Sequence, residues 1–387
     1  MKKFAVVLSY ILVFLVAVGA TCAVFTVGPL ASDGEYTKLE QLQDLIEERF
    51  VGESDSTAME DAAASAMVDS LGDEWSYYIS AADYQSYQDQ MQNAYVGVGI
   101  TISVMDDGYF EIMKVEDNGP AQAAGILPGD ILIAANGKDC AELGMAETRN
   151  TVRGEEGTTV ELTIRRGEEE IVLDVQRQYF EVTVAELEML AGGIGLVSIY
   201  NFDERCADET IAAIEEALAQ GASKLVFDVR NNPGGYKSEL VKVLDYLLPE
   251  GPLFVSETYD GKQETDKSDS DCLDIPMAVL VNGESYSAAE FFAAALSEYD
   301  AAIVVGEQTY GKGYYQQTYR LSDGSAVGLS VGKYYTPHGV SLAGVGITPD
   351  VQVDVDDETF EQIYYGNLEP AEDPQILAAI EALKSEN

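Results

Sequence analysis

The chain has 387 residues, of which 47% are hydrophobic and 23% charged, so it is long enough for two or three folded domains of ordinary composition. Its formal net charge is −46. So large a negative charge argues against nucleic-acid binding, which needs a basic surface, and against adhesion to anionic lipid headgroups. It fits a protein whose charged surface keeps it soluble in a salty or extracellular medium.

The N-terminus has the composition of a membrane anchor. Two lysines follow the first methionine and precede an apolar run from Phe4 to Leu30, with no charged residue before Asp33. About 20 apolar residues suffice to span a bilayer as a helix, whereas a cleaved secretory signal has a core of about 7–15. We therefore expect residues 1–30 to be an uncleaved single-pass anchor in the cell membrane, with the rest of the chain outside the cytoplasm. Secretion after signal cleavage is the alternative.

Residues 35–93 are expected to form a helical region. Apolar residues recur at helical spacing between Leu39 and Phe50, and again in an Ala-rich stretch that stops at Gly72. The region could be a small module of its own or an arm through which the chain forms a homodimer.

From Tyr95 onward the pattern changes to short apolar strands separated by Gly, Pro and Asn-Gly turns, which is typical of a compact β-rich domain. The domain begins with glycines that alternate with apolar residues. Backbone amides of Val98, Gly99 and Ile100 could turn toward a bound anion there. Such an anion could be the terminal carboxylate of a peptide whose backbone pairs with the adjacent strand edge.

A second block in this domain reads Gly119-Pro120-Ala121-Gln122-Ala123-Ala124-Gly125-Ile126-Leu127-Pro128-Gly129-Asp130, with Asn136-Gly137 after it. Together with the glycine-rich start, these residues resemble a PDZ domain over residues 95–178. The resemblance implies that the domain binds apolar C-terminal tails. Arg153 could be a polar latch between this domain and the rest of the chain, or an ordinary surface arginine.

Residues 185–365 alternate apolar strands with helices, which predicts a layered α/β core, followed by a short C-terminal helix within residues 370–387. The polar stretch Asp260–Asp274 is expected to be an exposed loop. The expected core elements are the strands Ile194–Ile199, Lys224–Val229, Met277–Val281, Ala302–Val305 and Ala326–Val331, and the helices Asp208–Ala219, Ser238–Leu247 and Ala288–Tyr299.

Ser287 and Lys312 form a candidate catalytic pair in this core. Ser287 would stand at a helix entrance, where unpaired backbone amides and the positive end of the helix dipole favour a developing oxyanion. Serine is also a favoured helix N-cap, so Ser287 by itself could be a plain cap. Lys312 favours catalysis, because burial without a counter-charge lowers a lysine pKa and yields a general base. The chain has a single histidine, His338, and a serine–lysine pair needs none.

Gln316 is the expected third member of this site. It follows Lys312 by four positions, so the two share a face if the segment is a strand. The amide carbonyl of Gln316 could orient the amine without adding charge, whereas a carboxylate would favour the protonated, inactive form.

A glycine-rich loop after the strand Lys224–Val229 could complete the site. It falls at a strand end, where α/β proteins place their sites. The amide of Gly234 or Gly235, together with that of Ala288, could form an oxyanion hole. A bare turn is the alternative.

Taken in order, the motifs of this core resemble those of the C-terminal processing peptidases, also called tail-specific proteases. The motifs are Asp228-x-Arg230-Asn-Asn-Pro-Gly-Gly235, Asn282-x-x-Ser-x-Ser287-Ala-x-Glu290, Gly306-Glu-x-Thr-x-Gly-Lys312-Gly-x-x-Gln316, Tyr334-Tyr-Thr-Pro337 and Gly346-Ile-Thr-Pro-Asp350. The resemblance covers about residues 40–360. It implies a serine endopeptidase with catalytic Ser287, Lys312 and Gln316. It also implies a crotonase-like layered α/β core with an inserted PDZ domain, which makes the chain a multidomain α+β protein.

Two residues depart from the family pattern. Tyr286 replaces a small residue and Ala289 replaces a serine, and neither change removes a catalytic atom. Tyr286 could narrow the pocket or alter substrate choice. Ser285, two positions before the nucleophile, is the residue that a misaligned motif would select. His338 falls where the family needs no histidine, so we expect it on the surface.

We therefore expect an extracytoplasmic protease that captures protein or peptide substrates by their apolar C-termini and cleaves them by a serine–lysine mechanism. No His/Cys metal spacing occurs, and neither a metal nor a cofactor is expected. One alternative is a catalytically silent PDZ adaptor that only binds tails. Another is acyl-CoA chemistry on the crotonase-like core, which the anchor and the PDZ domain disfavour.

Overall fold

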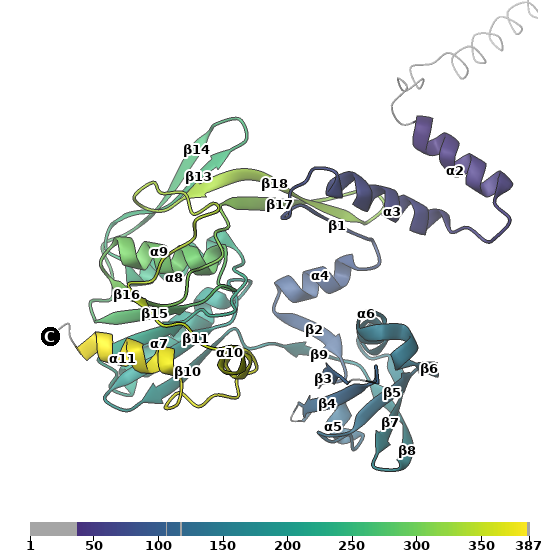
Figure 1. Ribbon diagram of the computed structural model, residues 1–387, viewed down its shortest axis with the longest axis horizontal. Coiled ribbons are helices and arrows are strands. Elements are labelled where there is room, and N and C mark those ends of the chain that lie inside the picture. Colours follow the sequence, from purple (N-terminus) through teal and green to yellow (C-terminus); the bar gives the residue numbers. More distant parts are fainter. Residues whose placement is uncertain (1–36, 106, 117, 385–387) are drawn as a thin grey trace, which may run out of the picture. The chain divides into compact units, whose positions relative to one another are not determined.

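The computed structural model describes residues 37–105, 107–116 and 118–384 (Figure 1). The chain divides into two compact units, with the boundary between Gly72 and Asp73. The expected anchor, residues 1–30, lies outside the described residues. Among the residues that the structure describes, no helix has both the length and the apolar character needed to cross a membrane.

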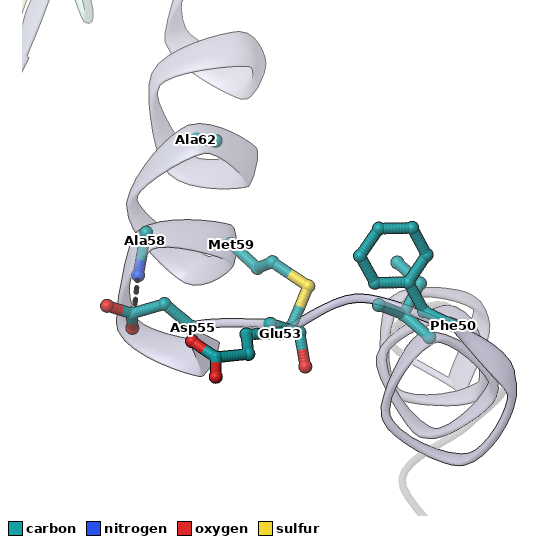
Figure 2. A pocket seen from close by; sticks show the side chains of 8 residues that line it. Phe50, Glu53, Asp55, Ala58, Met59 and Ala62 are labelled. Carbon is teal, nitrogen blue, oxygen red and sulfur yellow. Dashed lines mark hydrogen bonds between the residues drawn. The ribbon is translucent and has the colours of Figure 1, made fainter.

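The first unit contains the helices α2 (Thr37–Arg49) and α3 (Ser56–Asp69), which confirms the helical expectation for this stretch. Asp55 caps α3, since its carboxylate accepts a hydrogen bond from the backbone amide of Ala58 at 3.1 Å. A mostly apolar hollow of about 470 Å³ lies beside this cap, where Phe50 and Met59 face each other (Figure 2). None of the predicted site residues lines it.

The β-rich domain of the second unit follows α4 (Tyr84–Met91). Its sheet has the order β3-β4-β5-β7-β8, with β6 paired to β5, so β3 is an edge strand. Phe110, Ile112 and Leu132 are among its fully buried core residues. The elements are β3 (Ile100–Val104), β4 (Phe110–Val115), α5 (Pro120–Ala123), β5 (Ile131–Ala135), β6 (Lys138–Asp139), α6 (Cys140–Val152), β7 (Thr159–Arg166) and β8 (Glu169–Gln176).

A two-stranded ribbon carries the chain into this domain and out of it. It consists of β2 (Ala94–Gly97) and β9 (Gln178–Glu181), which are antiparallel. Arg205 holds the ribbon at the core, because its Nη2 donates to the carbonyls of Asn93 and Val182 at 2.9 and 2.6 Å. These two carbonyls flank the ribbon on its core side.

The core contains a six-stranded sheet of order β10-β11-β12-β15-β16-β19, parallel except for β10. Every residue of β15 is buried, because helices cover both faces of the sheet. Helices α7, α8 and α9 contribute to the core on one face and α11 to that on the other (Figure 1). The elements are β10 (Ala185–Leu190), β11 (Ile194–Ile199), α7 (Cys206–Ala219), β12 (Lys224–Asp228), α8 (Lys237–Leu247), β15 (Met277–Val281), α9 (Ala288–Glu298), β16 (Ala302–Gly306), β19 (Val351–Gln352), α10 (Asp357–Tyr364) and α11 (Pro374–Lys384).

A second sheet of the core runs β1-β18-β13-β14, with β17 also paired to β18. Two of its strands correct the expectations from sequence. β1 forms in the region expected to be helical, and β14 forms within the stretch expected to be a loop. Both are short segments whose strand state depends on pairing, β1 with the distant β18 and β14 with the preceding strand β13. The strands are β1 (Tyr77–Ile79), β13 (Gly251–Thr258), β14 (Gln263–Ser268), β17 (Tyr314–Arg320) and β18 (Ala326–Tyr335).

Candidate active site

Ser287 lies at the N-terminus of α9, directly after the loop that follows β15. Its backbone angles are φ 58° and ψ −120°, a conformation that residues with a side chain rarely adopt. A strained residue at a strand-to-helix turn is typical of a nucleophile that must project from the loop. Ser287 is the N-cap of α9 and forms a capping box with Glu290, but its backbone differs from that of an ordinary cap, which is usually extended.

Ser285 has a different environment, although it is only two positions away. Its side chain is fully buried. The hydroxyl donates to the carbonyl of Val229 at 2.7 Å and accepts from the amide of Asn282 at 3.0 Å. Ser285 thus ties the end of β15 to the end of β12, and this role leaves it inaccessible to a substrate.

Glu290 connects the loop of Ser287 with the loop of Lys312. Its Oε2 accepts from the backbone amides of Ser287 and Lys312 at 3.0 and 2.8 Å. Its Oε1 accepts from the hydroxyl of Thr309 at 2.9 Å and from the amide of Gly311 at 3.0 Å. Burial raises the pKa of Glu290, and these hydrogen bonds act in the opposite direction. One buried carboxylate therefore fixes both loops, a role that the sequence motif did not reveal.

Lys312 precedes β17, and burial of its side chain lowers its pKa to about 8. The carboxylates of Asp73, Glu290 and Glu74 act in the opposite direction, because they stabilise the charged amine. The Nζ atom lies 4.2 Å from the centre of the Trp75 ring. Within the described residues, no hydrogen bond joins this atom to the Ser287 hydroxyl.

Tyr334 on β18 contacts both candidate residues. Its hydroxyl donates to the backbone carbonyl of Lys312. Burial and the charge of Glu290 raise the pKa of Tyr334, whereas a hydrogen bond with the Ser287 side chain lowers it. Tyr334 belongs to a sequence motif of the family, but nothing in its spacing indicated a place beside the nucleophile.

Gln316 does not share a strand with Lys312. β17 begins only at Tyr314, and its pairing with β18 is irregular between Tyr315 and Gln316. Alternation along a strand therefore cannot place the two side chains on one face. The amide nitrogen of Gln316 donates to the Ser330 hydroxyl at 3.0 Å and to the Tyr314 carbonyl at 3.3 Å. No donor to its carbonyl oxygen is found in the described part of the chain.

The glycine-rich loop lies directly against the N-terminus of α9. A Cβ atom on Gly234 would come 2.8 Å from the amide nitrogen of Ala288. The amide of Gly234 is already engaged, since it donates to Asn232 Oδ1 at 2.8 Å. In the described residues the amides of Gly235 and Ala288 donate to no other group. Of the two glycines, Gly235 is thus the one with a free donor.

An aromatic cluster lies beside these residues. The ring centres of Trp75 and Tyr286 are 6.0 Å apart, those of Trp75 and Tyr310 are 5.4 Å apart, and those of Tyr286 and Tyr310 are 5.6 Å apart. Tyr286, whose role the sequence left unexplained, is therefore part of a three-ring contact. Trp75 lies far from Ser287 in the sequence, and no motif or spacing indicated that it belongs to the site.

In the β-rich domain, the carbonyls of Val98 and Gly99 accept from the amides of Ala121 and Glu116, each at 3.0 Å. The amides of Val98 and Gly99 donate to no protein group among the described residues. Gly99 has a φ of +79°, and Phe180 would be 2.9 Å from an added Cβ. Ile100, the third residue expected to bind a peptide, begins the edge strand β3.

His338 lies away from the chemistry described above, whereas Arg153 lines a hollow that is also lined by Pro233 of the glycine-rich loop. The His338 side chain is 65% exposed and lies 3.8 Å from Glu298, as expected for a surface histidine. Arg153 places its guanidinium carbon 5.4 Å from the centre of the Tyr95 ring, on the ribbon strand β2.

Comparisons with known proteins show which families the chain resembles. The model of peptidase family S41 matches residues 193–353, and a PDZ domain model matches residues 111–166. A "Probable CtpA-like serine protease" of Staphylococcus aureus (strain COL) is 32% identical over 321 residues, which cover 82% of this chain and 64% of the relative. A protein of the same name from Staphylococcus saprophyticus is 31% identical over 357 residues, which cover 89% of this chain and 72% of that protein.

A solved structure shows the same fold. The putative S41 protease of Bacteroides fragilis is 16% identical, with a TM-score of 0.53 over 84% of this chain and 90% of that chain. The chain spans 64% of the length of the Staphylococcus aureus relative. The expected fold class, a layered α/β protease core with an inserted PDZ domain and a helical N-terminal region, is confirmed. The chain belongs to peptidase family S41, the family of the CtpA-like serine proteases.

Proposed function

We propose that this chain is a serine endopeptidase of the C-terminal processing type, which captures an apolar C-terminal tail on its PDZ domain and cleaves by a serine–lysine mechanism. The observation that carries the proposal is the carboxylate of Glu290, which holds the amides of Ser287 and Lys312 on one oxygen. It joins a strained serine at a helix N-terminus to a lysine whose pKa is lowered to about 8.

In the proposed mechanism, neutral Lys312 accepts the hydroxyl proton of Ser287 as Oγ attacks the scissile carbonyl. The same amine then protonates the leaving nitrogen. With a pKa of about 8, roughly a tenth of the lysine is neutral at pH 7. That fraction is far larger than for an exposed lysine.

The oxyanion would be held by backbone amides. Among the residues that the structure describes, those of Ala288 and Gly235 donate to no other group, and Gly234 packs against Ser287. Gln316 would orient the amine of Lys312 through its carbonyl oxygen, because its amide nitrogen is already held by Ser330 and Tyr314. This assignment needs the amine of Lys312 to leave the Trp75 ring before attack.

Tail capture would use the turn at Val98, Gly99 and Ile100. The free amides at the start of the turn suit a terminal carboxylate, and the open edge of β3 can pair with an extended peptide. The apolar run at residues 4–30 supports an extracytoplasmic location, anchored or released after cleavage. A homodimer formed through the helical region stays a prediction.

The catalytic proposal is tested with Ser287→Ala, assayed on peptides that end in small apolar residues. The exposed turn residue Ser322→Ala is the matched control. We expect loss of cleavage with retained tail binding for the first variant, and unchanged cleavage for the control. Wild-type cleavage by Ser287→Ala would overturn the mechanism. Tail binding by the wild-type protein without any cleavage would instead support the silent adaptor.

In cells, C-terminal proteomics of membrane and secreted proteins would show which substrates keep uncut tails in the Ser287→Ala variant.

A further inference from the structure

The amine of Lys312 rests on the indole ring of Trp75. The 4.2 Å between Nζ and the ring centre is well inside the roughly 6 Å over which a cation is attracted to an aromatic face. Trp75 lies two residues before the start of β1, which is paired with β18, so the ring belongs to the same folded unit as Lys312. The lysine therefore has a defined partner other than the serine it is proposed to activate.

Trp75 is itself held in place. The rings of Tyr286 and Tyr310 contact it and each other, and they come from the loops of Ser287 and Lys312 respectively. The backbone on both sides of Trp75 is fixed as well. Ser76 donates to the carboxylate of Asp73 at 2.5 Å and accepts from the backbone amide of Ser330 on β18 at 3.1 Å. These contacts fix the indole ring in the position where it meets the amine of Lys312.

The charges around Lys312 also favour a protonated amine at its position on the Trp75 ring. The charged groups that act on it are the carboxylates of Asp73 and Glu74 from the Trp75 segment and that of Glu290 from α9. The phenol of Tyr334 donates to the backbone carbonyl of Lys312, and the rings of Tyr286 and Tyr310 contact the indole. A protonated amine is attracted by the carboxylates and by the ring. A neutral amine feels neither attraction, because both depend on its charge.

We propose that Trp75 is a positioning residue that holds the protonated side chain of Lys312 away from Ser287, and that the amine is released toward Ser287 when it gives its proton to solvent. This inference rests on the proposed serine–lysine mechanism. Tyr286 and Tyr310 support the indole, which gives the unusual Tyr286 a role in fixing the base instead of in contacting substrate.

Trp75 is the single tryptophan of the chain, so intrinsic fluorescence reports on this contact directly. Between pH 6 and pH 9 we expect the emission of the wild-type protein to follow the ionisation of Lys312. Lys312→Met should remove this transition, and Ser287→Ala should keep it. The exposed Lys262→Met is the control and should also keep it. A transition that persists in Lys312→Met, or its absence in the wild type, would overturn the proposal.

Because the fluorescence transition does not require catalysis, its failure is distinct from failure of the proposed function, which would appear as cleavage by Ser287→Ala. Kinetics add a second test. Trp75→Leu removes the ring that stabilises the charged amine, so the pKa of Lys312 should fall. The acid limb of the pH–rate profile should then shift to lower pH by roughly 0.5 to 1.5 units. Trp75→Phe should move it less.

A purely structural tryptophan would give a lower kcat with an unmoved acid limb, and that result would contradict the proposal. If Trp75→Leu does not fold, Trp75→Phe and the fluorescence of Lys312→Met decide the question.

Discussion

Gly234 lies so close to Ser287 that a methyl group on Gly234 would come within 2.8 Å of the Cβ of Ser287. Its φ of +90° also requires glycine. We expect Gly234→Ala to push the two loops apart and to lower kcat by at least about tenfold, since misplacement of about 1 Å can cost roughly 10²-fold. Gly261→Ala is the matched control, because Gly261 has a φ of +82° with open space around it. The control should lose about 1 kcal/mol of stability and no activity. Equal kcat values for both variants would contradict the packing argument.

Substitutions of Ser285 and Ser287 should change the free energy of unfolding in different ways. Ser285→Ala leaves the buried amide of Asn282 and the buried carbonyl of Val229 without their partner, so the free energy of unfolding should fall by about 1–3 kcal/mol. Ser287→Gly should be inactive yet at least as stable as the wild type, because glycine relieves the strained backbone. Denaturant unfolding monitored by circular dichroism measures both. A stable Ser285→Ala, or a destabilised Ser287→Gly, would go against this division of roles.

The rate of cleavage should depend on the ionisation of Lys312. The neutral amine is the active form, so kcat/KM should rise about tenfold per pH unit from pH 6 and level off near pH 8, where Lys312 has its pKa. A substrate without ionisable groups in this range, assayed from pH 6 to pH 9, gives the profile. A rate that is flat or falling between pH 6 and pH 8 would exclude Lys312 as the base.

Arg230 fixes the start of the glycine-rich loop. Its side chain is 4% exposed, pairs with Asp228 at 2.5 Å and with Asp373 at 2.8 Å, and also donates to Gln375. Arg230→Met should destabilise the protein by about 3–5 kcal/mol, because two carboxylates lose their counter-charge. The exposed Arg49→Met should change stability by less than about 0.5 kcal/mol. Thermal unfolding checks both, and similar melting temperatures for the two variants would refute the structural role.

Tail binding should depend on the turn at Gly99. Gly99→Ala forces a positive φ on alanine and brings its methyl group to 2.9 Å from Phe180, so the turn must shift. We expect at least a severalfold weaker affinity for a peptide with an apolar C-terminus, measured by calorimetry in the Ser287→Ala background. Gly137→Ala, in an open turn, is the control. Amidation of the peptide's C-terminus removes the carboxylate, so it should weaken binding to the Ser287→Ala protein. The Gly99→Ala and Gly137→Ala variants should then bind the amidated peptide with similar affinity.

Much of the core could be predicted from sequence because its strands are buried on both faces. β11 and β15 form over the predicted residues, since continuous apolar runs between helices have few alternatives. β14 could not be predicted because its sequence is polar. Four of its six side chains are exposed and one is half-buried, so only pairing with β13 makes it a strand. α6 was missed because Gly144, with a φ of +75°, interrupts its helical pattern.

Some contacts of the candidate active site could also be predicted from the sequence, and others could not. Gly234 lies against the N-terminus of α9, because the glycine-rich motif and the serine motif follow neighbouring strands of one sheet, whereas Gly235 lies against the backbone of Phe202. The contact between Lys312 and Trp75 could not be predicted, since it depends on the second sheet bringing β1 beside β18. The place of Gln316 was also beyond sequence reasoning, because β17 starts after Lys312 and is irregular before Gln316.

The ribbon of β2 and β9 has a consequence for how the protein can be re-engineered. Gly97 pairs with Gln178, so the two chain ends of the β-rich domain leave the core as neighbours. From the side of the core, the whole insertion is therefore equivalent to one long hairpin loop, and lengthening such a loop adds little closure entropy. The domain can in principle be exchanged as a cassette for another tail-binding module, or replaced by a two-residue turn, without re-threading the core.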